Sequence, residues 1–182
     1  MTRKYESNNH NLGMYVSTER KGTPGATMQA PSPVAPAVSA DGLYVCTYVY
    51  CQAGATLVPG EVVAIDYTSL TTVSNFKVTK SATSTDGTKF VVGVVPNNLK
   101  NKFGKIVNEV ASGSYFWAVC KGIVKVLDTG SATKGDLLKL SSTAGKVASS
   151  ASGIGHDAIG VALEDIGAAG LVTTMINAPF VP

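Results

Sequence analysis

The stretches AGATLVPGEVVAID (residues 53–66) and TGSATKGDLLKLSS (residues 129–142) follow the same order of residue types. Each has small residues and a threonine, then a glycine followed by an acid, then an apolar run. The glycine–acid pairs are Gly60–Glu61 and Gly135–Asp136. A glycine at this place suits a tight turn with positive φ, and the acid can accept hydrogen bonds from turn donors. We interpret both acids as structural rather than catalytic.

The parallel continues beyond these turns. About 33 residues after Gly60 comes the run Gly93-Val94-Val95, and about 25 residues after Gly135 comes Gly160-Val161-Ala162. Each half then closes with a Gly-led apolar strand, at residues 111–122 and 167–177. One copy cannot bury its apolar face, whereas two facing copies can place these faces inside. We therefore predict a mainly β fold, a compact β-sandwich or small β-barrel built from a duplicated strand-hairpin-strand unit.

Dense β-branched and aromatic runs separated by turn residues predict the individual strands. The predicted strands cover residues 43–51, 61–67, 75–80, 89–95, 115–128, 136–141, 158–163 and 171–176. KGDLLKLSSTAGKVA (residues 134–148) reads as strand, turn, strand, with Leu138 and Leu140 on one face. Residues 99–112 alone have apolar positions at helical spacing, but Gly104 interrupts them, so they form a short helix or a loop with one turn.

The N-terminal part of the chain differs from the rest. Residues 1–41 are rich in turn formers and prolines, which favour an extended conformation, and we predict an extended Pro-rich N-terminal arm before a β domain at 42–182. The arm also carries apolar side chains that could order on a partner, the alternative being a disordered tail. The predicted partner-binding residues are Tyr5, Leu12, Met14, Tyr15, Val16, Met28 and Val34.

The composition limits the classes of partner. Of the 182 residues 45% are hydrophobic and 15% charged, against about 25% charged in ordinary soluble domains, which suggests surfaces covered by something other than water. The net charge of +3 is too small to indicate direct nucleic-acid binding. No run reaches about 18 uninterrupted apolar residues, and the first residues lack the apolar core of a signal peptide. We expect neither a membrane span nor export by a standard signal.

The residues that could carry chemistry are few. Cys46, Cys51 and Cys120 form no CxxC pair, and neither a disulfide framework nor a zinc site is indicated. Cys46 and Cys51 are five residues apart, which places them on opposite faces of a strand. We interpret all three as reduced, buried thiols.

The remaining candidates are also better explained structurally. His156 and Asp157 are adjacent on a turn without a nucleophile, and the other histidine, His10, lies in the arm. Trp117 sits among apolar neighbours, which favours burial or an intersubunit contact over an exposed stacking platform. Three aspartates at strand ends could bind a cation but are ordinary turn residues: Asp66, Asp86 and Asp128. We predict no catalytic residues, no cofactor and no metal, and expect no enzyme activity.

With the arm and the duplicated unit in view, the chain resembles the capsid decoration, or cement, proteins of tailed bacteriophages. The features that carry the resemblance are ATLVPGEVVAID, VVGVV, WAVCKGIVKVL, SATKGDLLKLSSTAGKVA and AIGVALED, within residues 43–178. In that family a glycine–acid turn before an apolar strand recurs in this way.

The resemblance implies a virion protein made in the host cytoplasm that sits on the capsid surface, commonly as a homotrimer. It would bind the major capsid protein and cement neighbouring subunits, stabilising the head against the pressure of packaged DNA. An alternative is a β-sandwich binding module, either a head-fibre base or a carbohydrate-binding domain.

Overall fold

The computed structural model describes residues 16–31, 45–68, 71, 76–81, 91–101, 103–150 and 158–178. Over these residues the chain forms one sheet of ten strands and no helical element. No helix in this part of the chain is long and apolar enough to cross a membrane. The strands are β1 (Thr27–Pro31), β2 (Val45–Ala53), β3 (Val62–Ile65), β4 (Lys77–Lys80), β5 (Val91–Val94), β6 (Tyr115–Asp128), β7 (Leu137–Leu140), β8 (Val147–Ser150), β9 (Ala158–Ala162) and β10 (Gly170–Asn177).

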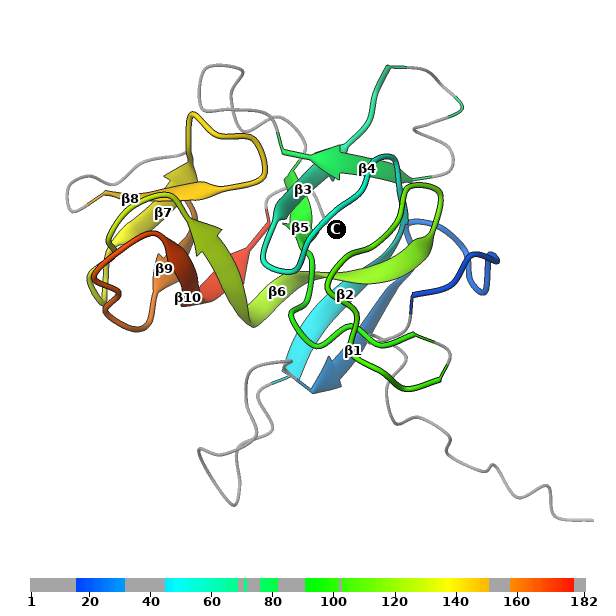
Figure 1. The fold of residues 1–182 in the computed structure, drawn as a ribbon, viewed down its shortest axis with the longest axis horizontal. Helices are drawn as coiled ribbons and strands as arrows, with labels where there is room; N and C mark the ends of the chain where they lie inside the picture. Colours follow the sequence, from blue (N-terminus) through cyan, green and yellow to red (C-terminus); the bar gives the residue numbers. More distant parts are fainter. Residues whose placement is uncertain are drawn as a thin grey trace, which may run out of the picture.

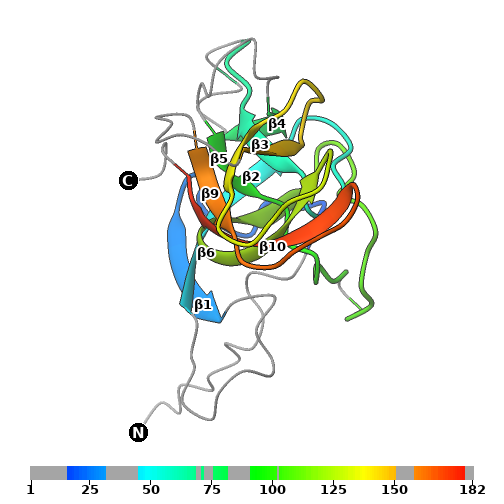
Figure 2. The same ribbon diagram turned by 90° about the vertical axis from the view of Figure 1, so that its left-hand side faces the viewer.

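The sheet closes into two five-stranded rings that share the long strand β6. Strands β2, β4, β3, β5 and the first half of β6 form the first barrel, which closes through the β2–β6 pairing. The second half of β6 with β10, β9, β7 and β8 forms the second barrel, which closes through β6–β8. The two barrels lie side by side with β6 running through both (Figure 1), and Figure 2 shows the second barrel facing the viewer.

The two barrels have the same strand pairing, residue for residue. β3 pairs with β5 through Val63 and Gly93, and β7 pairs with β9 through Leu138 and Gly160; in both pairs the register shifts at the next residue. Each ring also closes through a parallel contact, Ala53↔Val78 in the first barrel and Asp128↔Val147 in the second. The predicted duplication is therefore a structural one, and the mainly β, barrel-type fold is confirmed. Each copy closes on its own interior instead of facing the other copy, because its five strands suffice to surround an apolar core.

The barrel interiors hold the core. In the second barrel Leu138 and Leu140 point inward and are buried, while Leu137 and Lys139 lie on the outer face and are half-buried, as the predicted alternation requires. In the first barrel β3 and β5 are buried on both faces. Each fully buried Val or Leu contributes about 1.5–3 kcal/mol to folding. The first barrel is thus covered on the outside as well as filled.

Part of the N-terminal segment covers the first barrel. β1 pairs antiparallel with β2 over all five of its residues. The N–H of Lys21 donates to the Tyr50 hydroxyl at 2.8 Å, and Gly22 lies against the Tyr50 ring. Val16 and Met28, two of the predicted partner-binding residues, pack partly buried against the core of their own chain. The segment 16–31 therefore belongs to the folded body, although the sequence pattern did not predict β1.

The other predicted strands occur at the expected places. Residues 99–112 contain no helix among those described, so the loop interpretation holds. Leu99 and Val110 are buried at its two ends, and Lys100 bridges to Ile106 across a reversal at Gly104. The helical spacing of the apolar residues failed because two buried anchors, rather than one apolar face, fix this segment.

Candidate functional site

The duplicated glycine–acid turns have the same hydrogen bonds. The N–H of Val58 donates to Glu61 Oε2 at 2.8 Å, and the N–H of Thr133 donates to Asp136 Oδ2 at 2.9 Å. In both turns the glycine N–H donates to the end of a neighbouring strand, with Gly60 bonding to the Val95 carbonyl. Gly60 and Gly135 have φ of 87° and 97°, which favours glycine. The structural interpretation of both acids is confirmed.

The first of these turns docks on the second barrel. The carbonyl of Gly60 accepts a bond of 2.9 Å from the N–H of Leu127, and a Cβ at Gly60 would lie 2.4 Å from Leu171 Cδ2. Glu61 is buried, contacts Gly145 of the second barrel and forms a 2.7 Å ion pair with Lys80. This turn is therefore an inter-barrel joint.

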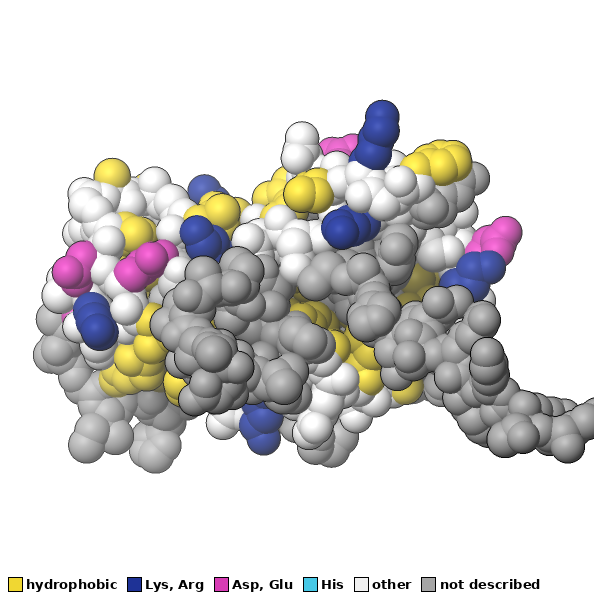
Figure 3. Space-filling view, turned by 90° about the horizontal axis from the view of Figure 1, so that it is seen from below, with side chains coloured by type: hydrophobic (Ala, Val, Ile, Leu, Met, Phe, Trp, Pro, Cys, Tyr) yellow, Lys and Arg dark blue, Asp and Glu magenta, His cyan; other side chains and the backbone are white. Residues whose placement is uncertain are grey.

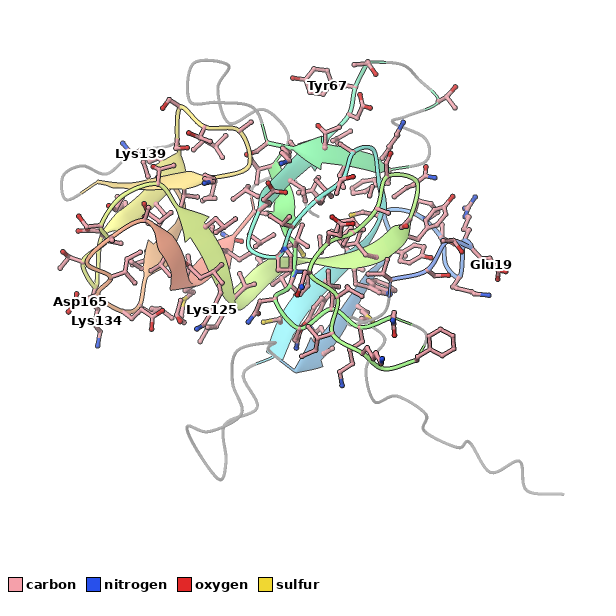
Figure 4. All side chains as sticks on the ribbon, viewed as in Figure 1. Glu19, Tyr67, Lys125, Lys134, Lys139 and Asp165 are labelled. Atoms are coloured by element: carbon pink, nitrogen blue, oxygen red, sulfur yellow. The ribbon has the colours of Figure 1, made fainter. Side chains whose placement is uncertain are left out.

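The second turn faces solvent. Thr133, Lys134 and Gly135 are exposed, and a Cβ at Gly135 would meet nothing within 4 Å. The N–H of Lys134 donates to Asp165 Oδ1 at 2.7 Å, and these two residues lie together at the outer end of the second barrel (Figure 4). The same turn structure therefore contacts the neighbouring barrel in the first copy and lies exposed to solvent in the second copy.

The three cysteine thiols lie in the core. Cys46, Cys51 and Cys120 are buried thiols that form no disulfide among the described residues, as expected. Burial raises the pKa of Cys51 well above its usual range and that of Cys120 to about 11. Because thiolate is the reactive form, neither Cys51 nor Cys120 is set up as a nucleophile at neutral pH.

The aspartates considered as cation ligands act as local caps. Asp66 accepts hydrogen bonds from the Thr68 N–H and hydroxyl, and these lower its pKa. Asp128 is buried and accepts a 2.7 Å bond from the Gly130 N–H, while its Oδ2 has no hydrogen-bond partner among the described residues. The described residues contain no group of three His, Cys, Asp or Glu side chains that could hold a metal. Asp86 lies outside the described residues.

Trp117 belongs to an aromatic cluster on the outer face of the first barrel. Its ring centroid lies 5.0 Å from that of Tyr50, which stacks on Tyr115 at 5.8 Å. Tyr50 is buried beneath the N-terminal segment, whereas Tyr115 and Trp117 are half-buried. Trp117 packs against the core, consistent with its apolar neighbours.

Large apolar side chains also reach the surface. Phe103 is 77% exposed and Ile106 64% exposed on the first barrel, and Met175 is 52% exposed on the second. Seen from below, hydrophobic side chains emerge at several places on both barrels with lysines between them (Figure 3). Contiguous exposed apolar patches are typical of protein-binding sites, whereas single exposed apolar side chains are ordinary. The exposure of Met175 was not predicted from the sequence, since Met175 reads as one of many strand residues.

Two grooves lie beside these residues. One, of about 610 Å³, runs between the N-terminal segment at Val16–Glu19 and the loop that carries Phe103 and Val107. The other, of about 690 Å³, lies on the second barrel beside Met175 and Val161. Both have more apolar than polar lining.

Several predicted residues lie outside the described part of the chain. His10, His156 and Asp157 are among them, as are five of the predicted partner-binding residues: Tyr5, Leu12, Met14, Tyr15 and Val34. Their partner-binding role stays a prediction.

Comparison with known proteins adds little. No family model matches the chain, and no curated protein matches it. Among solved structures the chain is similar to the N base of the head fibre protein gp8.5 of bacteriophage phi29, with 13% sequence identity and a TM-score of 0.45. The similarity covers 72% of this chain and 93% of the phi29 chain. A likeness at this TM-score carries no argument about function.

Proposed function

We propose that the chain is a structural virion protein that binds the outer surface of an icosahedral phage capsid and cements neighbouring major capsid protein subunits. The motif resemblance to decoration proteins supports this function. The observation that carries it is a contrast between residue types: the thiols and duplicated acids have structural roles, whereas large apolar side chains are exposed. The described thiols and both duplicated acids serve the core and the turns, whereas Phe103, Ile106 and Met175 reach solvent.

A cement needs separate contacts on one stiff body. β6 runs through both barrels for 14 residues, about 46 Å at 3.3 Å per residue. The Gly60 turn and the Glu61–Gly145 contact brace the two barrels on either side of this strand. Contacts made by the first and second barrels are thereby held at a fixed spacing, as bridging between capsid subunits requires.

The proposed protein acts in many copies, as a trimer on the capsid. Avidity then multiplies contacts that are individually modest. The arm adds reach, because a segment that orders on binding can wrap a large surface at a cost in entropy. Light scattering at micromolar concentration tests the trimer, and a clean monomer would count against preassembly.

Capsid binding is tested by cosedimentation of the purified chain with empty shells of the phage that encodes it. We expect saturable binding, and decorated DNA-filled heads should release DNA at a higher temperature than bare heads. Absence of binding refutes the proposal.

The role of the N-terminal arm in capsid binding is tested by a deletion whose end point is set by the structure. Removal of residues 1–15 leaves β1 and the Lys21–Tyr50 contact intact, whereas removal of residues 1–40 would strip β1 from β2. We expect the shorter deletion to stay folded and to bind shells more weakly. Full binding by this variant would contradict a role for residues 1–15.

The aromatic cluster supports a second candidate, a binding module such as a head-fibre base or a carbohydrate binder. Tyr115 and Trp117 are half-buried, and stacking on sugars uses such rings. In this case Trp117→Ala should abolish binding on a glycan array while capsid attachment is unchanged. Lack of glycan binding by the unaltered chain would remove the carbohydrate form of this candidate.

A further inference from the structure

An apolar row crosses four strands on the outer face of the second barrel. Leu137 of β7 is paired with Val161 of β9, Val161 with Met175 of β10, and Met175 with Ile123 of β6. Residues in direct register lie on the same face of a sheet, and all four line the 690 Å³ groove. We call these four residues the outer row.

The first barrel contains the same row, but covered. The equivalent cross-strand pairs there are Val62↔Val94, Val94↔Val119 and Tyr48↔Val119. All four of these side chains are at most 1% exposed. In the outer row, by contrast, Met175 is 52% exposed and Leu137 and Val161 are only half-buried. The fold therefore covers this face in one copy and leaves it partly open in the other.

Lysines border the outer row. Lys139 lies two residues from Leu137 on the same face of β7, and Lys121 and Lys125 flank Ile123 on β6. The pKa of Glu164 is lowered mainly by its hydrogen bonds from Thr173 and to a smaller extent by the charge of Lys125. Lys121 lines the groove. Among the described residues that line the groove there is no carboxylate. Lys125 and Lys139 both lie on the second barrel in Figure 4.

This charge pattern selects the kind of partner. A second copy offers its exposed Phe103 and Ile106 on a loop that also carries Lys100, Lys105 and Glu109. Lys100 pairs with Ile106 and Lys105 precedes it, so the charges nearest to this apolar pair would set lysine against lysine. Two outer rows placed face to face would also bring lysines of one copy against lysines of the other. Like charges brought together disfavour an interface, whereas opposite charges guide and orient it. An aliphatic surface bordered by Asp and Glu fits the outer row.

We infer that the outer row and its lysines form the docking surface for such a protein partner. The inference rests on the proposed function in taking the major capsid protein as that partner. Met175 is the central contact, since it is the most exposed of the four and sits between Val161 and Ile123. The few residues that dominate the affinity of an interface cluster near its centre.

The test compares two exposed side chains of nearly equal accessibility in cosedimentation with empty shells. Met175→Asp should weaken binding by about tenfold or more, because it places a charge in the apolar contact. Tyr67→Asp is the control, since Tyr67 is 53% exposed on a loop beyond β3 (Figure 4). It should bind as the unaltered chain does. Circular dichroism and thermal unfolding establish that both variants are folded.

A second pair of variants tests the charges. The double variant Lys121→Glu/Lys139→Glu should weaken shell binding and reduce its dependence on salt, whereas Lys134→Glu, at the exposed turn of the same barrel, should do neither.

The outcomes separate the two hypotheses. Shell binding by the unaltered chain that Met175→Asp leaves intact overturns the docking surface and leaves the proposed function standing. Failure of the unaltered chain to bind shells overturns both. Dissociation of an oligomer by Met175→Asp, with capsid binding per chain unchanged, would assign the row to contacts between copies and also overturn the inference.

Discussion

The substitutions Gly60→Ala and Gly135→Ala should separate two contributions to the free energy of unfolding. One is the backbone strain of the turn, and the other is the contact between the two barrels. Gly60 and Gly135 occupy equivalent positions with similar positive φ. A methyl group at Gly60 would lie 2.4 Å from Leu171 Cδ2 and 3.1 Å from Leu127 Cγ, whereas at Gly135 it would point into open space. The two substitutions therefore share the backbone cost and differ in the contact.

The magnitudes follow from these contacts. Holding a non-glycine residue in the left-handed region costs about 1–2 kcal/mol, which is the full effect expected for Gly135→Ala. Gly60→Ala adds overpacking, typically about 1–3 kcal/mol. Leu171 is partly exposed and can shift, but Leu127 is fixed by the bond between its N–H and the Gly60 carbonyl. We expect Gly60→Ala to lower the free energy of unfolding by about 2–5 kcal/mol in total.

Equilibrium unfolding in urea measures both variants, with the slope m compared to that of the unaltered chain. A shift of the midpoint at constant m reports stability alone, whereas a lower m or two transitions for Gly60→Ala would report uncoupled barrels. Equal losses for the two variants would refute the assignment of the Gly60 turn as a joint that stabilises the fold.

Four further outcomes follow from particular contacts. Glu61→Gln should cost about 1.5–3 kcal/mol in urea unfolding, because it removes the charge from a buried hydrogen-bonded carboxylate; a loss below 0.5 kcal/mol, about that of an ordinary surface change, would contradict its structural role. Hydrogen bonds from Thr173 lower the pKa of Glu164 from 4.5 in the folded chain. The stability that the ionised Glu164 gives the fold is therefore present above pH 4.5 and lost as the pH falls through the lowered pKa of the folded state. Glu164→Gln should flatten this acid dependence of the thermal midpoint. A thiol reagent at pH 8 should leave Cys120 and the other two cysteines unmodified in the native chain and modify all three in denaturant, and rapid native labelling would contradict their burial. Gly93→Ala and Gly160→Ala should both greatly reduce soluble yield, since each added Cβ would lie 2.3 or 2.5 Å from a carbonyl oxygen, and tolerance of either would contradict the shared register.

The sequence predicts the local structure of this protein well because its turns are locally determined. The glycine–acid pairs need positive φ and a side-chain acceptor wherever they occur, so both turns and the strands after them could be placed from residue types alone. Gly93 and Gly160 were likewise paired because each begins a short apolar run after its turn, and the structure puts them in equivalent strands.

The closure of the barrels was beyond the sequence pattern. YFWAVCKGIVKVLD reads as one long strand, and nothing in its alternation shows that its two halves join different rings. Partner choice depends on contacts far apart in the chain, such as Asp128 with Val147. β1 was missed for a related reason, since TMQAP is short, ends in proline and becomes a strand only because the edge of β2 is available.

The structural roles of the thiols and of the duplicated acids were easier to predict from the sequence than the contact surface. A buried thiol or a capping acid is recognisable from its neighbours, but exposure of Met175 depends on whether another part of the chain covers it. Val119, at the equivalent place in the first barrel, has the same strand setting and is fully buried.

Differences between the two copies show how each outer position is adapted to its surroundings. Where the first turn meets the second barrel it carries Val58 and Pro59, and where the second turn meets solvent the same places hold Thr133 and Lys134. Buried Ala64 likewise corresponds to Lys139. The outer row does not follow this rule, because it stays aliphatic although the folded chain leaves it partly open. An aliphatic row that faced only water would gain nothing from remaining apolar. A contact beyond those that the described residues make, as proposed for the docking surface, would account for this aliphatic character.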